Sequence, residues 1–262
     1  MEPKKAPLKQ NRSTFDKVFD ALISWVESKN IQYSVHGNPP IYDNELFPWA
    51  AAFEEDWELI RAELDEVMKD HAALPSFHEI TKEVETITTD NNWKTFFLAG
   101  YGIECEENRR RCPNTVKALE KIPGMKTAMF SILSPQKHIP AHRGPYNGVL
   151  RYHLGLIVPE PRENCKIRVD KQFYNWSEGK GVIFDDCFDH EVWNDTDGIR
   201  VVLFVDVQRP MTGFGNWLNT MVINLAKHTP YLKEANKNQK EWEKKFYAKK
   251  AQEKREEVGV GK

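Results

Sequence analysis

The stretch that decides the fold is Val149–Leu156, which reads VLRYHLGL. Side chains of a β-strand alternate between its two faces, so Tyr152 and Leu154 share one face. Arg151 and His153 share the other face, and burying two such polar groups on a dry face would be costly. This face is therefore either exposed to solvent or part of the lining of a polar pocket.

A second apolar stretch, residues 200–207 (RVVLFVDV), poses the same question, because it begins with Arg200. The stretch is too apolar to be an edge strand. Two predicted strands that each carry an inward arginine favour a pocket for an anion. Arginine suits a carboxylate because its planar guanidinium group can bond both oxygens.

Short β-rich runs surround these two stretches. Turn residues such as Asn147-Gly148 and Asp197-Gly198 separate them, and the runs cover residues 127–134, 149–158, 165–170, 172–176, 180–184, 190–193 and 200–207. Seven short strands in about eighty residues predict an antiparallel sandwich or barrel of the jelly-roll type.

Helical patterns flank this β-rich part. Apolar spacing predicts helices from Thr14 to Val26, from Phe53 to Val67 and from Pro113 to Leu119, another after Pro210, and a charged helical tail. Residues 1–12 are polar and basic, which is typical of a frayed tail. We expect three parts: a helical or irregular extension packed on the core (1–90), the β core (91–211) and a helical tail (212–262).

The composition indicates an ordinary cytoplasmic globular protein. Of 262 residues, 40% are hydrophobic and 29% are charged, and the net charge of −2 gives no reason to expect nucleic acid binding. The sequence shows neither a signal peptide nor an apolar run long enough for an integral membrane segment. The four cysteines have no CxxC spacing, so we expect reduced thiols.

Two histidines are predicted at strand ends on either side of the presumed anion pocket, His142 and His190. Either one alone is more often a structural or surface residue. Non-haem iron oxygenases bind iron through two histidines and one carboxylate, usually arranged as His-x-Asp or His-x-Glu at the first position. Here Gly144 stands where that carboxylate would be.

Residues 93–210 resemble the aspartyl/asparaginyl β-hydroxylase family of Fe(II)- and 2-oxoglutarate-dependent oxygenases. The resemblance is carried by Phe130-Ser131-Ile132, His142-x-Gly144-Pro145, Leu150-Arg151-x-His153-Leu154-Gly155-Leu156, Cys165–Arg168, Trp176-x-Glu178-Gly179, Phe184–Asp186, His190–Trp193 and Arg200 with Val205–Val207. Animal members also have glycine at the carboxylate position. Bacterial members, including the lipid A 2-hydroxylases, are similar over a longer stretch, through Asn92–Phe96, Cys112–Thr115 and Arg209–Met211.

The resemblance implies a mainly β fold, a double-stranded β-helix (jelly roll, cupin-like) with flanking N- and C-terminal helices. It implies that His142 and His190 bind Fe(II). It also implies that Ser131 and Arg200 hold the distal carboxylate of the cosubstrate 2-oxoglutarate. Arg151 and His153 would hold the other end of 2-oxoglutarate, which chelates the metal. O2 would react at the same metal. For the remaining metal position we favour water over Asp185 or Asp186.

The resemblance predicts a dioxygenase that hydroxylates an unactivated carbon. The first expectation is β-hydroxylation of an aspartyl or asparaginyl residue or a related small acid. However, Val149 stands where the animal peptide hydroxylases carry a further arginine, and the His-x-Asp motif and membrane anchor of the lipid A enzymes are missing. The substrate class, peptide, small molecule or lipid, therefore stays open.

Three alternatives accompany this prediction. A hydroxylase of lipid acyl chains would require a weak association with a membrane surface, for which the basic, tryptophan-bearing tail is the candidate. An iron halogenase would bind chloride where the carboxylate is missing. A non-catalytic binding module could use the same barrel without a metal.

Overall fold

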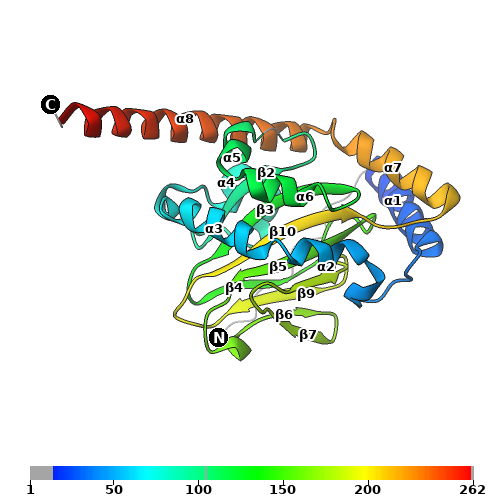
Figure 1. Ribbon diagram of the computed structural model, residues 1–262. Helices are drawn as coiled ribbons and strands as arrows, with labels where there is room; N and C mark the ends of the chain where they lie inside the picture. The colour runs from blue at the N-terminus through cyan, green and yellow to red at the C-terminus, as the bar shows by residue number, and fades with distance from the viewer. Residues whose placement is uncertain (1–13, 104, 261–262) are drawn as a thin grey trace, which may run out of the picture.

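The computed structural model describes residues 14–103 and 105–260, so the tail predicted at 1–12 lies outside the described residues. Its core consists of two antiparallel sheets (Figure 1). Their strands are β1 (Ile41–Tyr42), β2 (Trp93–Ala99), β3 (Met125–Leu133), β4 (Lys137–His142), β5 (Val149–Ile157), β6 (Cys165–Val169), β7 (Gln172–Asn175), β8 (Gly181–Phe184), β9 (His190–Asn194) and β10 (Arg200–Gln208).

The strand order is that of a double-stranded β-helix. The larger sheet has the order β1-β8-β5-β10-β3-β2 and the smaller one β4-β9-β6-β7. From β3 to β10 the chain passes between the two sheets so that strands close in sequence are split between them. The predicted jelly-roll fold with flanking helices is confirmed.

Alternation along β10 separates the core from the site. Leu203 and Val205 belong to the apolar cluster on the outer face of the larger sheet. Val202 belongs to the cluster between the two sheets, and Arg200 lies against Trp176 of that cluster. The same alternation in β5 places Tyr152, Leu154 and Leu156 outside and Arg151 and His153 inside, as the sequence predicts.

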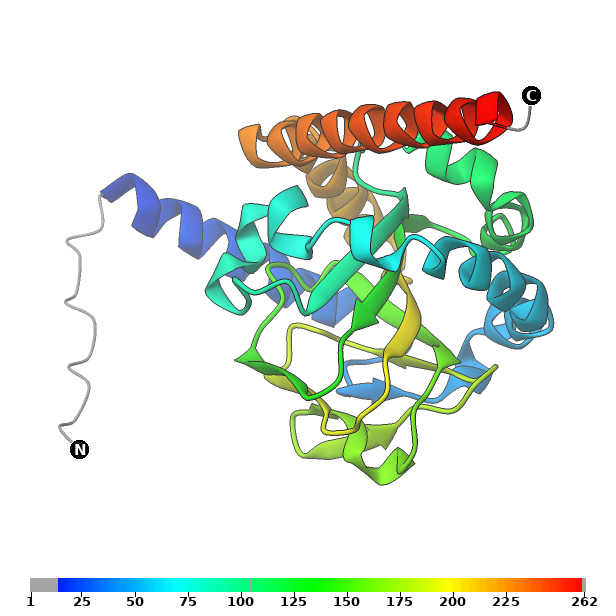
Figure 2. The same ribbon diagram turned by 90° about the vertical axis from the view of Figure 1, so that its left-hand side faces the viewer.

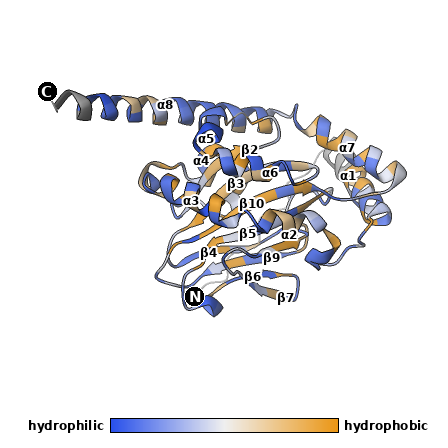
Figure 3. Cartoon of the chain, viewed as in Figure 1, coloured by the Kyte–Doolittle hydropathy of each residue, from blue (hydrophilic) through white to orange (hydrophobic). Residues whose placement is uncertain are grey.

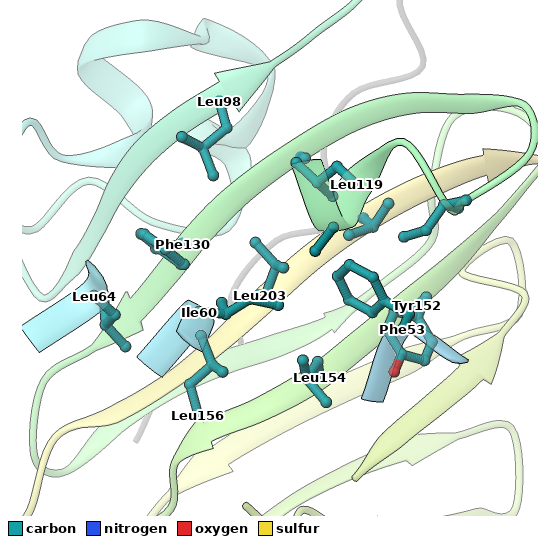
Figure 4. Packing of buried hydrophobic residues seen from close by; sticks show 14 of the residues in the cluster. Phe53, Ile60, Leu64, Leu98, Leu119, Phe130, Tyr152, Leu154, Leu156 and Leu203 are labelled. Atoms are coloured by element: carbon teal, nitrogen blue, oxygen red, sulfur yellow. The ribbon is translucent and has the colours of Figure 1, made fainter. Parts of the chain in front are cut away.

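Helices cover the outer face of the larger sheet: α2 (Pro48–Glu54), α3 (Trp57–Met68) and α6 (Pro113–Leu119). Figure 4 shows Ile60 and Leu64 of α3 among the side chains of the sheet, which include Phe130, Leu156 and Leu203. The single helix predicted from Phe53 to Val67 is wrong in one respect, because the chain breaks between α2 and α3.

The remaining helices lie at the ends of the sheets. They are α1 (Thr14–Tyr33), α4 (Phe77–Ile80), α5 (Glu106–Arg111), α7 (Gly213–Ala226) and α8 (Pro230–Val260), with 3-10 turns at Asn44–Leu46, His71–Ala73, Lys82–Thr86 and Arg162–Asn164. Helices α1 and α7 pack against each other. Helix α8 runs past α4 and α5 (Figures 1 and 2) and buries Ala235, Gln239 and Phe246.

Strand β4 is a difference from the sequence analysis, which predicts no strand at 137–142. It forms an edge of the smaller sheet, pairs with β9 and ends at His142. An edge position tolerates Pro140, which has no backbone N–H to donate. None of the helices in the described residues is long and apolar enough to cross a bilayer.

Candidate functional site

The two predicted metal ligands meet at the end of the smaller sheet. His142 is the last residue of β4, His190 is the first of β9, and the two are directly paired across the strands. Their ring centres lie 4.0 Å apart. The Nδ1 atom of His142 lies 2.8 Å from the carbonyl oxygen of Pro140, and that of His190 lies 3.0 Å from the carbonyl oxygen of Phe188.

These hydrogen bonds fix the chemistry of both rings. A carbonyl oxygen only accepts, so each ring donates from Nδ1–H and keeps the lone pair of Nε2 for a ligand. Burial lowers the pKa of His142 and lowers that of His190 to about 4. Both imidazoles are therefore neutral at physiological pH, which is the form that binds a metal ion.

Arg200 is a buried cation without a counter-charge. Its side chain is 1% exposed and its guanidinium carbon lies 4.6 Å from the ring centre of Trp176. Its Nη1 atom lies 3.5 Å from the carbonyl oxygen of Ser131, and it has no carboxylate partner among residues 14–103 and 105–260. Burial lowers its pKa to about 10, so it stays charged at neutral pH and requires an anion.

Ser131 lies on the neighbouring strand β3 and faces the same space. It pairs with Val202, two residues along β10 from Arg200. Its hydroxyl oxygen accepts a hydrogen bond of 3.0 Å from the indole N–H of Trp93, so its own proton is left to donate. The structure therefore places a hydroxyl donor and a guanidinium group together, which is the combination expected for a carboxylate ligand.

His153 is another buried polar group in the space between the sheets. Neither ring nitrogen has a hydrogen bond within the described part of the chain. Its ring lies 5.0 Å from that of Phe184 and 5.3 Å from that of Phe204. Burial, with the nearby charge of Arg200, holds the pKa of His153 well below its usual range. A buried imidazole with both nitrogens unsatisfied fits a polar ligand in the space between the sheets.

Arg151 differs from Arg200 because two carboxylates neutralise it. Its Nη1 atom lies 2.8 Å from Oδ2 of Asp186, and its Nε atom donates to Oδ1 of Asp206 over 2.9 Å. Its guanidinium also lies over the ring of Phe204. The sequence analysis missed these partners, although Asp206 interrupts an apolar strand at the position paired with Arg151, which was a usable signal.

Asp186 fills the space that a side chain at position 144 would take. A Cβ atom added to Gly144 would lie 2.3 Å from Oδ2 of Asp186. Asp186 is 1% exposed, and its negative charge acts on both His142 and His190. Gly144, which stands where other non-haem iron oxygenases carry a carboxylate ligand, therefore lies next to the carboxylate of Asp186.

Asp185 contacts different residues from Asp186. It forms a buried ion pair with Arg209, whose guanidinium also donates to Asn147 and Tyr42. Asp185, Asp186 and Cys187 offer ligand atoms within 4.8 Å of one another, but the ion pair with Arg209 already occupies Asp185. Of the two aspartates considered for the metal, Asp186 is therefore the one beside the histidines.

Comparison of the sequence with known proteins identifies the family of the chain. Residues 54–210 match the family model described as aspartyl/asparaginyl beta-hydroxylase. The chain is 55% identical over 236 residues to an ornithine lipid ester-linked acyl 2-hydroxylase of Rhizobium tropici, covering 90% of this chain and 84% of that protein. It is 38% identical over 164 residues to human aspartyl/asparaginyl beta-hydroxylase, covering 61% of this chain and 21% of the human protein.

Solved structures give weaker matches. A Pseudomonas putida prolyl-4-hydroxylase matches with a TM-score of 0.41 at 16% identity, covering 62% of this chain and 99% of that one. The sequence matches cover the strands of His142 and His190 as well as those of Arg151 and Arg200, and the Rhizobium protein matches at 55% identity. The chain belongs to the aspartyl/asparaginyl β-hydroxylase family, and the hydroxylases among its relatives support a hydroxylase activity for this chain.

Proposed function

We propose that this protein is an Fe(II)- and 2-oxoglutarate-dependent hydroxylase that acts on carbon 2 of an acyl chain in an amino-acid-containing lipid. The observation that carries the proposal is the 55% identity to the Rhizobium ornithine lipid hydroxylase, which extends over 90% of this chain. The peptide hydroxylase matches at lower identity and over 61% of the chain. Val149, where the peptide enzymes carry an arginine, agrees with the lipid reading.

The residues present fit the cofactors that this activity needs. His142 and His190 would hold iron through Nε2, because their Nδ1 atoms are committed to carbonyl oxygens. Arg200 and Ser131 would hold the distal carboxylate of 2-oxoglutarate, since Arg200 is buried with no carboxylate partner in the described chain. His153 would bond the other end of the same ligand through a ring nitrogen that is otherwise unsatisfied.

Arg151 would then act differently from the expectation that it binds the cosubstrate directly. It is held by Asp186 and Asp206, so its main role would be to keep Asp186 beside the histidines. Phe184, Phe204 and Trp176 surround His153 with apolar rings, which would keep water away from the bound cofactors.

Iron and 2-oxoglutarate, when bound, supply the oxidation: O2 gives one oxygen atom to the substrate C–H bond and the other to succinate, with release of CO2. The chain itself supplies neutral imidazoles, a fixed cation for the keto-acid and an apolar wall. Helices α2, α3 and α6 cover the outer face of the larger sheet, so substrate would reach the site from the end of the sheets where the histidines lie.

The test is a paired assay of the full chain with Fe(II), 2-oxoglutarate and O2. Ornithine lipid dispersed in detergent is one substrate, and a peptide containing aspartate and asparagine is the other. We expect succinate release coupled to the gain of one oxygen atom on the ester-linked acyl chain. Hydroxylation of the peptide with the lipid untouched would instead support the β-hydroxylase reading, and turnover without 2-oxoglutarate would overturn the cofactor assignment.

A further inference from the structure

Helix α7 has two apolar faces, and one of them is largely exposed. Leu218 and Ile223 are buried against the body of the protein. Phe214, Trp217, Met221 and Leu225 follow at spacings of three, four and four residues, and they are 45%, 59%, 38% and 62% exposed. The helix contains no charged residue between Gly213 and Ala226. A surface helix ordinarily has a single apolar stripe, so the second one indicates a surface that binds something.

Helix α1 extends this surface. Leu22 and Trp25 are 53% and 46% exposed, and the half-buried Tyr33 follows about two turns later on the same side of the helix. The Tyr33 ring contacts the Phe214 ring at 6.0 Å. A Cβ atom at Gly215 would lie 2.2 Å from Cβ of Tyr33, so this glycine allows the close approach of the two helices. We call the surface formed by Leu22, Trp25, Phe214, Trp217, Met221 and Leu225 the α1–α7 face.

Cationic side chains border the α1–α7 face. The Nζ atom of Lys29 lies 6.0 Å from the ring centre of Trp25. Lys227 follows the last turn of α7 and acts on Lys126, whose pKa is lowered by burial and by that neighbouring charge. Exposed tryptophans and aliphatic side chains beside lysines are the composition of a surface that binds at the head-group level of an anionic bilayer.

The two helices that carry the α1–α7 face are attached to the candidate site. The loop of residues 143–148 follows His142. Asn30 of α1 donates to Asn147 over 2.9 Å, and Asn219 of α7 donates to the Gly148 carbonyl oxygen over 2.8 Å. Arg143 and Glu27 form an ion pair of 2.8 Å. The same two helices therefore carry the exposed apolar stripes on one side and, on their buried side, hold the loop that leads into the histidine pair.

The described part of the C-terminal tail offers no comparable surface. The Trp242 ring stacks on that of Phe246, and its indole N–H donates to the Ala73 carbonyl oxygen over 3.4 Å. Phe246 is buried. Figure 3 shows α8 coloured hydrophilic along most of its length. Its aromatic residues attach the tail to the protein, so the tail is a poor candidate for the membrane contact considered for it.

We propose that the α1–α7 face docks on an anionic lipid bilayer and delivers a membrane-resident acyl substrate to the site beside residues 143–148. The identity of the substrate rests on the proposed function, whereas the docking surface rests on the exposed apolar stripes, their cationic border and their attachment to that loop.

The experiment measures binding of the full chain to vesicles of phosphatidylcholine and phosphatidylglycerol in about a two-to-one ratio, by flotation, with pure phosphatidylcholine vesicles for comparison. A Trp217→Ser/Leu225→Ser variant should bind the anionic vesicles at least about tenfold less tightly. The matched control is Phe173→Ser/Leu59→Ser, which removes side chains of 61% and 54% exposure on β7 and α3. It should bind like the wild type.

Each other outcome overturns the docking proposal. Wild-type protein that stays off the vesicles, or equal binding by both double variants, shows that the face does not meet lipid. If light scattering shows that the wild type is a dimer and the Trp217/Leu225 variant a monomer, the occupant is a second copy of the chain.

A Lys126→Gln/Lys227→Gln variant should lose only the preference for phosphatidylglycerol.

Activity in detergent separates this proposal from the proposed function. Lipid dispersed in micelles reaches the site without bilayer docking, so the Trp217→Ser/Leu225→Ser variant should lose far less activity on micelles than on vesicles. If the wild type binds vesicles through this face but hydroxylates no lipid in either form, the lipid substrate is wrong while the docking surface stands.

Discussion

His142 and His190 are directly paired on neighbouring antiparallel strands, with ring centres 4.0 Å apart. Two imidazoles at this distance would repel each other if both were protonated. Burial keeps them neutral by lowering the pKa of each ring, and the hydrogen bonds to Pro140 and Phe188 fix their Nδ1 protons. The backbone of the smaller sheet therefore holds the pair in one arrangement before any ligand arrives.

Replacing either histidine with alanine should abolish turnover. We expect His142→Ala and His190→Ala each to lower succinate release at least about 100-fold, because one imidazole is too few to hold the iron. His138→Ala is the matched control, since His138 is 44% exposed on the same strand β4 and pairs with Glu191. The measurement is Fe(II) binding together with succinate release. Retained turnover in either site variant would place the iron elsewhere.

The two buried arginines should respond in opposite ways to replacement by methionine. Arg200 has no carboxylate partner in the described chain, so Arg200→Met should keep or raise the free energy of unfolding while raising the KM for 2-oxoglutarate about 30-fold or more. Arg209 is paired with Asp185, so Arg209→Met should lower the free energy of unfolding by about 3–5 kcal/mol.

Urea unfolding of the two methionine variants, alongside 2-oxoglutarate titration of Arg200→Met, checks both expectations. Strong destabilisation by Arg200→Met would mean that the arginine stabilises the barrel instead of waiting for a ligand. An unchanged KM would show that the cosubstrate binds without it.

A side chain at position 144 should disturb Asp186. The Cβ atom of Gly144→Ala would lie 2.3 Å from the Asp186 carboxylate and would push it from its place beside Arg151. We expect a loss of about 1–3 kcal/mol in stability, from overpacking, together with reduced activity. In an Asp186→Ala background the same substitution should be nearly neutral, so a double-mutant cycle with chemical unfolding measures the contact. Additive effects would refute it.

His153 should make the stability of the metal-free protein depend on pH. Burial holds its pKa well below the usual value of about 6.5, so the folded state rejects a proton that the unfolded state accepts. This contribution to stability is complete above about pH 6.5 and is lost as the pH falls toward the folded pKa.

The matched variant is His153→Leu, which suits the apolar walls of Phe184 and Phe204. Below about pH 6, the wild type should lose stability more steeply than this variant, by roughly 1.4 kcal/mol per pH unit. Urea midpoints between pH 5 and pH 7.5 (roughly the range over which histidine titrates) test this. Equal slopes would mean that His153 carries a proton in the folded state.

The sequence predicts the barrel because its strands carry strong local patterns. In β5 the alternation alone assigns Arg151 and His153 to the inner face, and the structure confirms it. Strand β4 is missed because Lys137–His142 is polar and contains Pro140. Such a segment becomes a strand only when β9 supplies its hydrogen bonds, and that partner lies about fifty residues further along the chain.

The site is harder to predict than the fold because its pairings are long-range. Alternation along β5 places Arg151 inside but does not predict its contacts with Asp186, which reaches it from the turn after β8, or with Asp206, which reaches it from β10. The same limit applies to Arg200, since the sequence does not show which residues surround its side chain in the folded protein. The helix break between α2 and α3 also lacks a local signal, because no proline or glycine stands between Glu54 and Trp57.

Strand β10 carries the stability of the protein and its chemistry on opposite sides of one backbone. Leu203 and Val205 support the helical layer, while Arg200 and Asp206 face the site. An insertion or deletion of one residue in this strand would exchange the two sets at once. Evolution toward new substrates must therefore leave β10 intact and act through the loop at 143–148 and the helices fastened to it, which tolerate change without reversing a strand.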